Sequence, residues 1–170
     1  MSDLLNLKPG IKKFLIYLFL ISIVFIIDRV SKILILNILN DKEKVDIYIN
    51  SFLNFYLVWN SGVGFGLLSA DQFYIYHTIT LFIILINIVI IYLIYKENNY
   101  KSYFFLMILG GSLGNLFDRI YYRAVPDFID FNYKGFHWFI FNVADIFITI
   151  GIICLIFAEL LNYKSNDEKK

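Results

Sequence analysis

Four long apolar segments dominate this chain and decide which environment it can fold in. They are residues 11–36, 73–95, 102–122 and 142–163. A hydrocarbon core about 30 Å thick is crossed by roughly 20 residues of helix, and each segment reaches that length. We therefore expect an all-α integral membrane protein with four transmembrane helices.

Composition agrees with a membrane location. Apolar residues make up 59% of the 170 residues, and the mean hydropathy is +0.69, whereas ordinary globular chains are about 45–50% apolar. Residues 1–170 are predicted to form a single membrane domain. The first segment resembles a signal sequence, but no small-residue cleavage site follows it, so we expect an uncleaved span.

The distribution of positive charge predicts the orientation. Four spans place both termini on one side, together with the short connection at residues 96–101. That side carries eight of the fifteen Lys and Arg residues, whereas the opposite connections carry four. Because positive residues are retained in the cytoplasm, both termini are expected there.

The outer connections are residues 37–72 and 123–141, and the first of them is not a plain linker. Residues 45–49 alternate in polarity and residues 52–59 are mostly β-formers, which predicts a small extracytoplasmic β-hairpin or sheet. Aromatic side chains favour the headgroup zone of a membrane. The second connection is therefore expected to be an aromatic surface loop, with Phe131, Phe136, Trp138, Phe139 and Phe141.

Several functional classes are excluded by what the chain lacks. A net charge of +1 argues against nucleic acid as a partner. The single cysteine, Cys154, rules out a disulfide framework. His77 and His137 are too few and too scattered for a metal site, so no metal and no cofactor is expected.

Charged and polar residues from four separate segments fall at the outer ends of the predicted spans. They are Asp28, Arg29 and Lys32 in the first span, Asp118 and Arg119 in the third, Asp145 in the fourth, and the glycine-rich stretch 60–66 before the second. Ionisable residues inside a membrane are costly and usually mark a functional site. Their convergence at one depth predicts such a site near the outer surface.

The third span carries small and polar residues at helical spacing. Gly111, Asn115 and either Asp118 or Arg119 share one face, and residues 110–114 form a GxxxG motif that favours close helix packing. The glycines could belong to the functional site, or they could serve only to pack this helix against its neighbours. Residues 110–114 also match the GxSxG nucleophile elbow, but that motif needs a strand and a sharp turn, so Ser112 is not expected to be a nucleophile.

Two further acidic motifs supply candidate catalytic groups. Asp127 and Asp130 follow Pro126, which favours an extended loop or a helix start at the surface. Asn142 is a suitable N-cap for the fourth span and would place Asp145 in its first turn. The alternatives are solvated loop acids for the first pair and a simple helix cap for Asp145.

Two buried aspartates would give a chemistry that needs neither metal nor covalent nucleophile. Adjacent carboxylates do not both ionise easily, so the pair shares one proton. The ionised member then takes a proton from water while the other donates one, which hydrolyses an amide bond. A proton or ion pathway through the same charges remains an alternative, as does a non-enzymatic assembly factor.

Five motifs in chain order resemble the lipoprotein signal peptidases, or signal peptidase II. They are Asp28-Arg-Val-Ser-Lys32, Asn60-Ser-Gly-Val-Gly-Phe-Gly66, Leu109-Gly-Gly-Ser-Leu-Gly-Asn-Leu-Phe-Asp-Arg119, Val125-Pro-Asp-Phe-Ile-Asp130 and Phe141-Asn-Val-Ala-Asp145. The second departs from the family pattern at Val63 and Gly64. The departure concerns that loop and not the two acidic motifs.

The resemblance implies a role for each matched residue. Asp127 and Asp145 would be the catalytic pair, and Asn60, Asn115, Arg119 and Asn142 would position the substrate. The polar residues that hold the outer architecture would be Asp28, Lys32, Gly62 and Asp118. The role of Asp130 stays open, with a structural role favoured.

The resemblance also implies a substrate and a location. The family removes signal peptides from prolipoproteins, cutting N-terminal to a diacylglyceryl-modified cysteine. We therefore expect a multi-pass monomer in the bacterial cytoplasmic (inner) membrane, with its active site toward the outer leaflet. Prolipoproteins, membrane lipid and inhibitors of the globomycin type are the implied partners.

Overall fold

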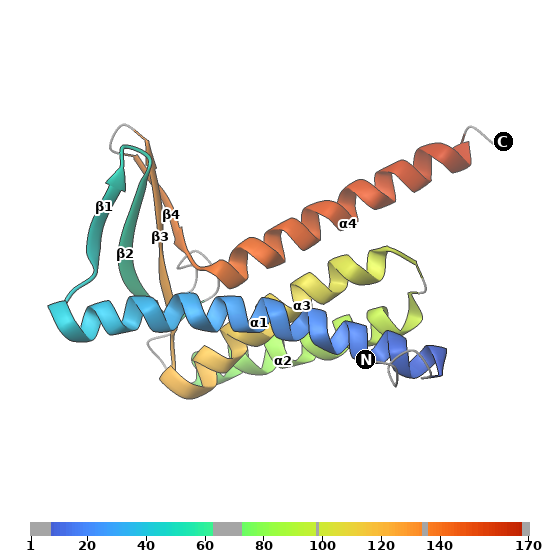
Figure 1. Cartoon of the computed structure of the whole chain (residues 1–170), viewed down its shortest axis with the longest axis horizontal. Coiled ribbons are helices and arrows are strands. Elements are labelled where there is room, and N and C mark those ends of the chain that lie inside the picture. The colour runs from blue at the N-terminus through green and yellow to red at the C-terminus, as the bar shows by residue number, and fades with distance from the viewer. Residues whose placement is uncertain (1–7, 63–72, 98, 134–135, 168–170) are drawn as a thin grey trace.

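The computed structural model describes residues 8–62, 73–97, 99–133 and 136–167. These residues form α1 (Pro9–Lys42), β1 (Asp46–Asn50), β2 (Leu53–Asn60), α2 (Phe73–Lys96), α3 (Lys101–Tyr122), β3 (Val125–Tyr133), β4 (Phe136–Phe141) and α4 (Val143–Asp167). The strands stand at one end of the helices, whereas α1 begins and α4 ends at the opposite end (Figure 1).

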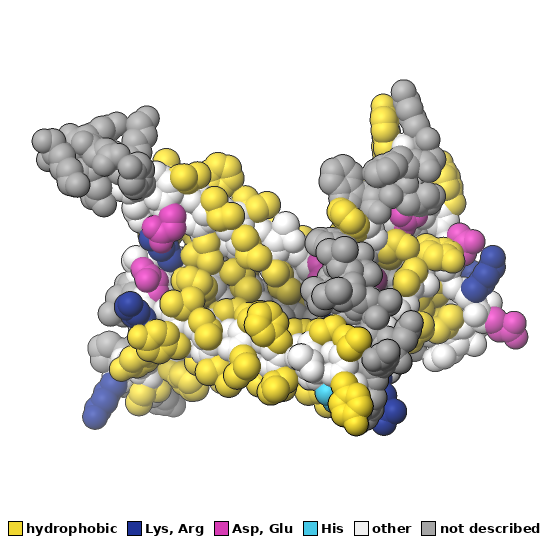
Figure 2. Space-filling model, turned by 180° about the vertical axis from the view of Figure 1, so that it is seen from behind, with side chains coloured by type: hydrophobic (Ala, Val, Ile, Leu, Met, Phe, Trp, Pro, Cys, Tyr) yellow, Lys and Arg dark blue, Asp and Glu magenta, His cyan; other side chains and the backbone are white. Residues whose placement is uncertain are grey.

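Three helices in the described part of the chain are long and apolar enough to cross a membrane: Gly10–Lys42, Tyr74–Lys96 and Val143–Asn162. Hydrophobic side chains cover much of their surface, and charged side chains gather toward the two ends of the molecule (Figure 2). α1 continues six residues beyond the predicted 11–36 segment, and it ends where Glu43 adopts a left-handed φ of 63°.

α3 fills the fourth predicted span, with 22 residues, but it is more polar than the other three helices. The reason lies in its position, because it packs against α1, α2 and α4. Its buried residues include Lys101, Asp118 and Arg119, which therefore face protein instead of lipid. A central helix can carry polar groups that a lipid-facing helix would not tolerate.

Two glycines of α3 allow its neighbours to approach closely. A Cβ at Gly111 would lie 2.5 Å from the carbonyl oxygen of Ala144 on α4, and one at Gly114 would lie 2.5 Å from Oδ2 of Asp28 on α1. The GxxxG stretch is thus a packing face, in agreement with the alternative drawn from the sequence. The close approach also brings the polar residues of three helices together.

The strands form one antiparallel sheet in the order β1-β2-β3-β4. The predicted hairpin corresponds to β1 and β2, whereas the segment expected to be an aromatic surface loop forms β3 and β4. Pro126 lies at the second position of β3 and pairs with Trp59. Proline favours the ends of strands, so it was compatible with a strand as well as with a loop.

The base of the sheet is fixed to the helices by a small hydrophobic cluster. Ile35 of α1, Val45 and Phe128 of β3 are buried together there. The register of β2 with β3 places Asn60 opposite Val125 and Val58 opposite Asp127. The start of β3 is therefore held directly at the end of the helical bundle.

Candidate active site

A cavity of about 300 Å³ lies where β2 and β3 meet α3 and α4. It is lined by six of the residues singled out in the sequence: Asn60, Asn115, Arg119, Asp127, Asn142 and Asp145. Five of them lie on β2, α3, β3 and α4, and Asn142 directly precedes α4. The rest of the lining includes aliphatic side chains of α2 and α4, such as Ile83, Ile148 and Ile152.

Asp127 is buried at the start of β3, with only 3% of its surface exposed. Its Oδ1 accepts a hydrogen bond from the side-chain amide of Asn142 at 2.6 Å, and its Oδ2 accepts one from Asn60 at 2.9 Å. Both bonds come from neutral amides. Among the described residues, these two neutral donors fix the orientation of the carboxyl group.

Asp145 lies in the first turn of α4, where it forms a capping box with Asn142. The Oδ1 of Asn142 accepts a bond from the backbone N–H of Asp145 at 3.2 Å, and Oδ2 of Asp145 accepts one from the backbone N–H of Asn142 at 3.1 Å. The N-cap predicted from the sequence is thus present. It orients a carboxylate that also lines the cavity.

Asn142 connects the two aspartates. Its side-chain nitrogen donates to Asp127, while its side-chain oxygen and its backbone N–H bind Asp145. Asn142 has no exposed surface. A single rigid residue therefore sets the relative position of both carboxyl groups.

Burial in the first place, and the nearby carboxylate of Asp145 in addition, raise the pKa of Asp127 to about 6. The amides of Asn142 and Asn60 oppose the shift because they stabilise the charged form. At mildly acidic pH, near 6, the Asp127 carboxyl can therefore hold a proton beside a negatively charged partner. That is the state a general acid and a general base need at the same time.

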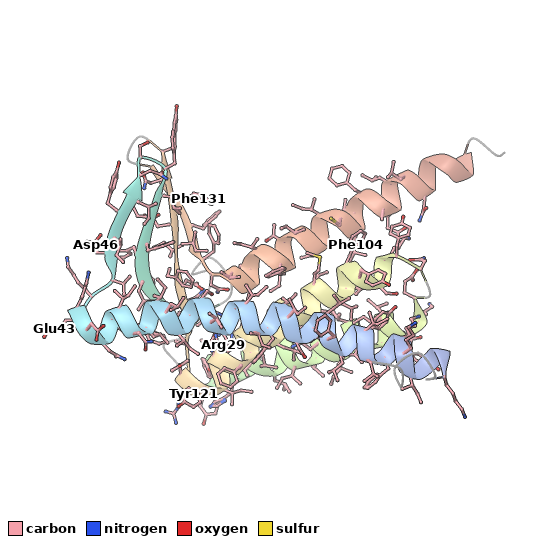
Figure 3. All side chains as sticks on the ribbon, in the orientation of Figure 1. Arg29, Glu43, Asp46, Phe104, Tyr121 and Phe131 are labelled. Carbon is pink, nitrogen blue, oxygen red and sulfur yellow. The ribbon has the colours of Figure 1, made fainter. Side chains whose placement is uncertain are left out.

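A second polar cluster, the ion cluster, lies beside the cavity and consists of Asp28, Arg29, Lys32 and Asp118. Lys32 contacts Asp28 at 2.9 Å and Asp118 at 2.6 Å, and Arg29 contacts Asp118 at 2.6 Å. Arg29 is labelled on α1 in Figure 3, where that helix crosses α3. Asp28 also accepts a bond from the backbone N–H of Ala144 at 3.0 Å, which ties α1 to the first turn of α4.

Asn115 joins the ion cluster to the aspartate pair. Its Oδ1 accepts a hydrogen bond from Nζ of Lys32 at 2.9 Å, and its Nδ2 donates to Oδ1 of Asp145 at 2.8 Å. Lys32 itself has no exposed surface. The sequence predicted that these residues converge, but it did not predict this order of contacts.

Arg119 holds the segment that follows β2. Its guanidinium donates to the carbonyl oxygens of Ser61, at 3.3 Å, and of Gly62. Asn60 accepts a bond from the backbone N–H of Gly62 at 3.0 Å. The hydroxyl of Tyr76 on α2 donates to the carbonyl of Arg119, a contact that no sequence motif indicated. Val63 and Gly64, the departures from the family motif, lie outside the described residues.

The structure does not support a catalytic role for Asp130, for Ser112 or for a metal ion. Asp130 is buried on β3 and accepts a long hydrogen bond from Asn54 at 3.5 Å, but it does not line the cavity. Ser112 does line it, within the continuous helix α3 and not on a strand-to-helix turn. Among the described residues, no three His, Cys, Asp or Glu side chains are grouped as a metal site would require.

A second hollow, an apolar groove of about 470 Å³, is lined by Asp145 and by side chains of the sheet and of α4. Three phenylalanines of the sheet line it, together with Ile146, Thr149 and Ile150. The phenylalanines are Phe131, Phe139 and Phe141. Phe131 is labelled in Figure 3, on the side of the sheet toward α4. Asp145 and Thr149 line both hollows, so the cavity and the apolar groove adjoin each other at this part of α4.

The chain is similar in sequence to known peptidases over most of its length. The family model described as signal peptidase (SPase) II matches residues 20–161. A protein of Pelagibacter ubique named lipoprotein signal peptidase is 53% identical over 163 residues, which are 95% of this chain and 98% of that protein. A protein of the same name from Francisella tularensis subsp. novicida is 37% identical, over 94% of this chain and 98% of its own.

The fold is also similar to that of a solved bacterial membrane enzyme. The two share 30% sequence identity and superpose with a TM-score of 0.69, covering 91% of this chain and 92% of the other. A second solved bacterial membrane enzyme gives 31% identity and a TM-score of 0.68, over 85% of this chain and 92% of its own.

Proposed function

The chain belongs to the signal peptidase II family, and we propose that it hydrolyses its substrate with Asp127 and Asp145 as the catalytic pair. It is a peptide hydrolase of the bacterial inner membrane that removes signal peptides from prolipoproteins. The finer parts of the proposal are the aspartic mechanism, the cleavage position and the orientation in the membrane.

The observation that carries the mechanism is the bridging of both aspartates by Asn142. Its hydrogen bonds of 2.6 Å to Asp127 and 3.1 Å to Asp145 hold two carboxyl groups at one cavity. A pair that shares one proton acts as acid and base together. Among the residues that the structure describes, the cavity lining includes no cysteine, histidine or lysine.

The proposed reaction balances without any other group. The oxygen of a water molecule attacks the scissile carbonyl carbon and passes a proton to the ionised aspartate, while the other aspartate protonates the carbonyl oxygen. The diol intermediate then collapses. The amide nitrogen takes the proton from the first aspartate, the C–N bond breaks, and a diol hydroxyl returns its proton to the second aspartate. The pair ends in its starting state.

The apolar groove supports a lipid-bearing substrate. A diacylglyceryl-cysteine on the C-terminal side of the scissile bond places acyl chains within a few bonds of the reacting carbonyl. Asp145 lines the groove, and the other lining side chains are almost all apolar. Cleavage N-terminal to the lipidated cysteine would bring the peptide bond to the pair while the acyl chains remain in an apolar environment.

The charge distribution supports an orientation with both termini in the cytoplasm. The eight Lys and Arg residues on that side belong to the two terminal segments and the α2–α3 connection, against four in the outer connections. The sheet and the aspartate pair would then lie toward the outer leaflet. The sheet stands at the end of the helices remote from the start of α1, in agreement with that arrangement (Figure 1).

The test is cleavage in proteoliposomes, with a diacylglyceryl-modified prolipoprotein and its unlipidated twin. We expect only the lipidated form to be cut, no effect of EDTA, and loss of cleavage by at least about 10³-fold in Asp127→Asn and in Asp145→Asn. Activity retained by either variant, or lost with EDTA, would overturn the aspartic mechanism. Inhibition by globomycin, and the behaviour of a monomer in detergent, are further expectations of the proposal.

A further inference from the structure

We infer that Lys32 is a positioning residue for the catalytic pair, which acts through Asn115 to keep the negative charge on Asp145 and the proton on Asp127. This inference rests on the proposed function, because it assigns the two roles within the proposed pair. It gives Lys32 a part in the reaction in addition to its place in the ion cluster.

The contacts of Asn115 fix the orientation of its side-chain amide. A lysine ammonium has only donors, so Asn115 must turn its oxygen toward Lys32, where the distance is 2.9 Å. Its NH₂ group then has to point the other way, toward Oδ1 of Asp145 at 2.8 Å. The amide therefore always offers a donor to Asp145, and it never offers an acceptor to a protonated carboxyl.

The buried positive charge of Lys32 lies next to the Asn115 amide that donates to Asp145. Lys32 is fully buried, and a nearby cation polarises the amide so that its N–H groups become stronger donors. The other oxygen of Asp145 accepts the backbone N–H of Asn142 at 3.1 Å, at the positive end of the α4 dipole. Both oxygens of Asp145 are thus bound by groups that favour a negative charge.

Asp127 has a different environment. It also accepts two hydrogen bonds, but they come from the neutral amides of Asn60 and Asn142. The oxygen of Asn60 binds the N–H of Gly62, and the oxygen of Asn142 binds the N–H of Asp145, so neither amide is polarised by a cation of the ion cluster. When one proton is shared, Asp127 is the member that keeps it.

The surroundings of Asp145 contain other charges that a test must control. The titratable and charged groups presented by the elements around the pair are Asp28, Arg29 and Lys32 from α1, Tyr76 from α2, Asp118 and Arg119 from α3, and Asp127 from β3. The ion cluster is neutral as a whole, with two acids and two bases. Removing Lys32 alone would leave a buried unpaired acid, which is strongly destabilising.

Two double variants remove one ion pair each and leave the cluster neutral. The test variant is Lys32→Gln with Asp118→Asn, which takes away the cation that contacts Asn115. The matched control is Asp28→Asn with Arg29→Gln, which keeps the 2.6 Å contact of Lys32 with Asp118 and the contact of Lys32 with Asn115. Both lose the same number of charges, so a purely structural effect should be similar in the two.

The measurement is the pH dependence of kcat for the lipidated substrate in proteoliposomes. In the test variant we expect the acid limb, which reports ionisation of the base, to move to higher pH by about one unit, with about tenfold less activity below the limb. The control should move the limb by much less than the test variant does, because it keeps the cation that contacts Asn115. KM should change little in either, since Lys32 does not line the cavity.

An unshifted limb in the test variant, or an equal shift in both variants, would overturn the inference. If the test variant folds, as judged by Tm, but has no turnover, infrared titration of its carboxyl groups gives the same comparison directly. If it does not fold, Lys32→Arg replaces it: the cation is kept, so its limb should stay in place, and a shifted limb would count against the inference. Failure of the proposed function gives a different result from failure of this inference: the Asp127→Asn variant would still cleave the substrate.

Discussion

The side-chain amide of Asn142 donates a hydrogen bond of 2.6 Å to Oδ1 of Asp127, although the two residues lie on different elements of the fold. The same residue caps α4 through its side-chain oxygen. Asn142 thus has a structural role and a role at the candidate site. The two roles can be separated by substitution.

Asn142→Ala should lose both roles. We expect a loss of about 1 kcal/mol of stability from the missing cap, and a fall in kcat of about 10²-fold because Asp127 loses its orienting donor. Asn142→Ser provides the control, since serine is also a good N-cap but is too short to reach Asp127. Its Tm should recover toward that of the unmodified protein while its kcat stays low. Recovery of both would show that capping alone matters.

Stability should depend on pH through Asp127. The folded pKa of about 6 lies above the unfolded value of about 3.9, so the folded state binds the proton more tightly. Stability should therefore be greatest below about pH 4 for this group and should fall by about 3 kcal/mol as the pH rises through 6. Tm in detergent, measured from pH 4 to 8, should show this slope in the unmodified protein and lack it in Asp127→Asn. Equal slopes would contradict the prediction.

Gly111→Ala should separate α3 from α4 next to the candidate site. The added Cβ would lie 2.5 Å from the carbonyl oxygen of Ala144, the neighbour of Asp145. We expect a destabilisation of about 1–3 kcal/mol and a lower kcat, because α4 must shift with its first turn. Gly10→Ala is the matched control, since no heavy atom lies within 4 Å of its Cβ position. Unchanged Tm and kcat in Gly111→Ala would mean that the helices adjust freely.

Glu159→Gln should distinguish the peptidase from a proton or ion pathway. Glu159 pairs with Lys101 at 2.6 Å near the far end of α4, and its side chain is 68% exposed. It lies 14 residues from Asp145, or about 21 Å along the helix. We expect cleavage within about twofold of the unmodified enzyme, because Glu159 does not line the cavity and a glutamine oxygen can still accept a hydrogen bond from the buried Lys101. Loss of cleavage together with loss of proton flux in the same vesicles would favour a pathway instead.

The local sequence was enough to predict the helices and the hairpin. An apolar segment of about 20 residues has the length of a helix that crosses the hydrocarbon core of a bilayer. The alternation at residues 45–49 favours a strand. The cap formed by Asn142 was also predictable, because its partner Asp145 is three residues away. Each of these features depends on neighbours along the chain.

Only the tertiary structure decided how the polar residues contact one another. β3 was expected to be a loop because the partner that makes it a strand, β2, is more than sixty residues earlier in the sequence. Lys32 and Asn115 are separated by 83 positions, and no pattern near either residue indicates that they form a hydrogen bond. Tyr76 had no signal at all, although its hydroxyl binds Arg119. The physical reason is that hydrophobic length and capping act locally, whereas these contacts exist only once the helices pack and the sheet closes over their ends.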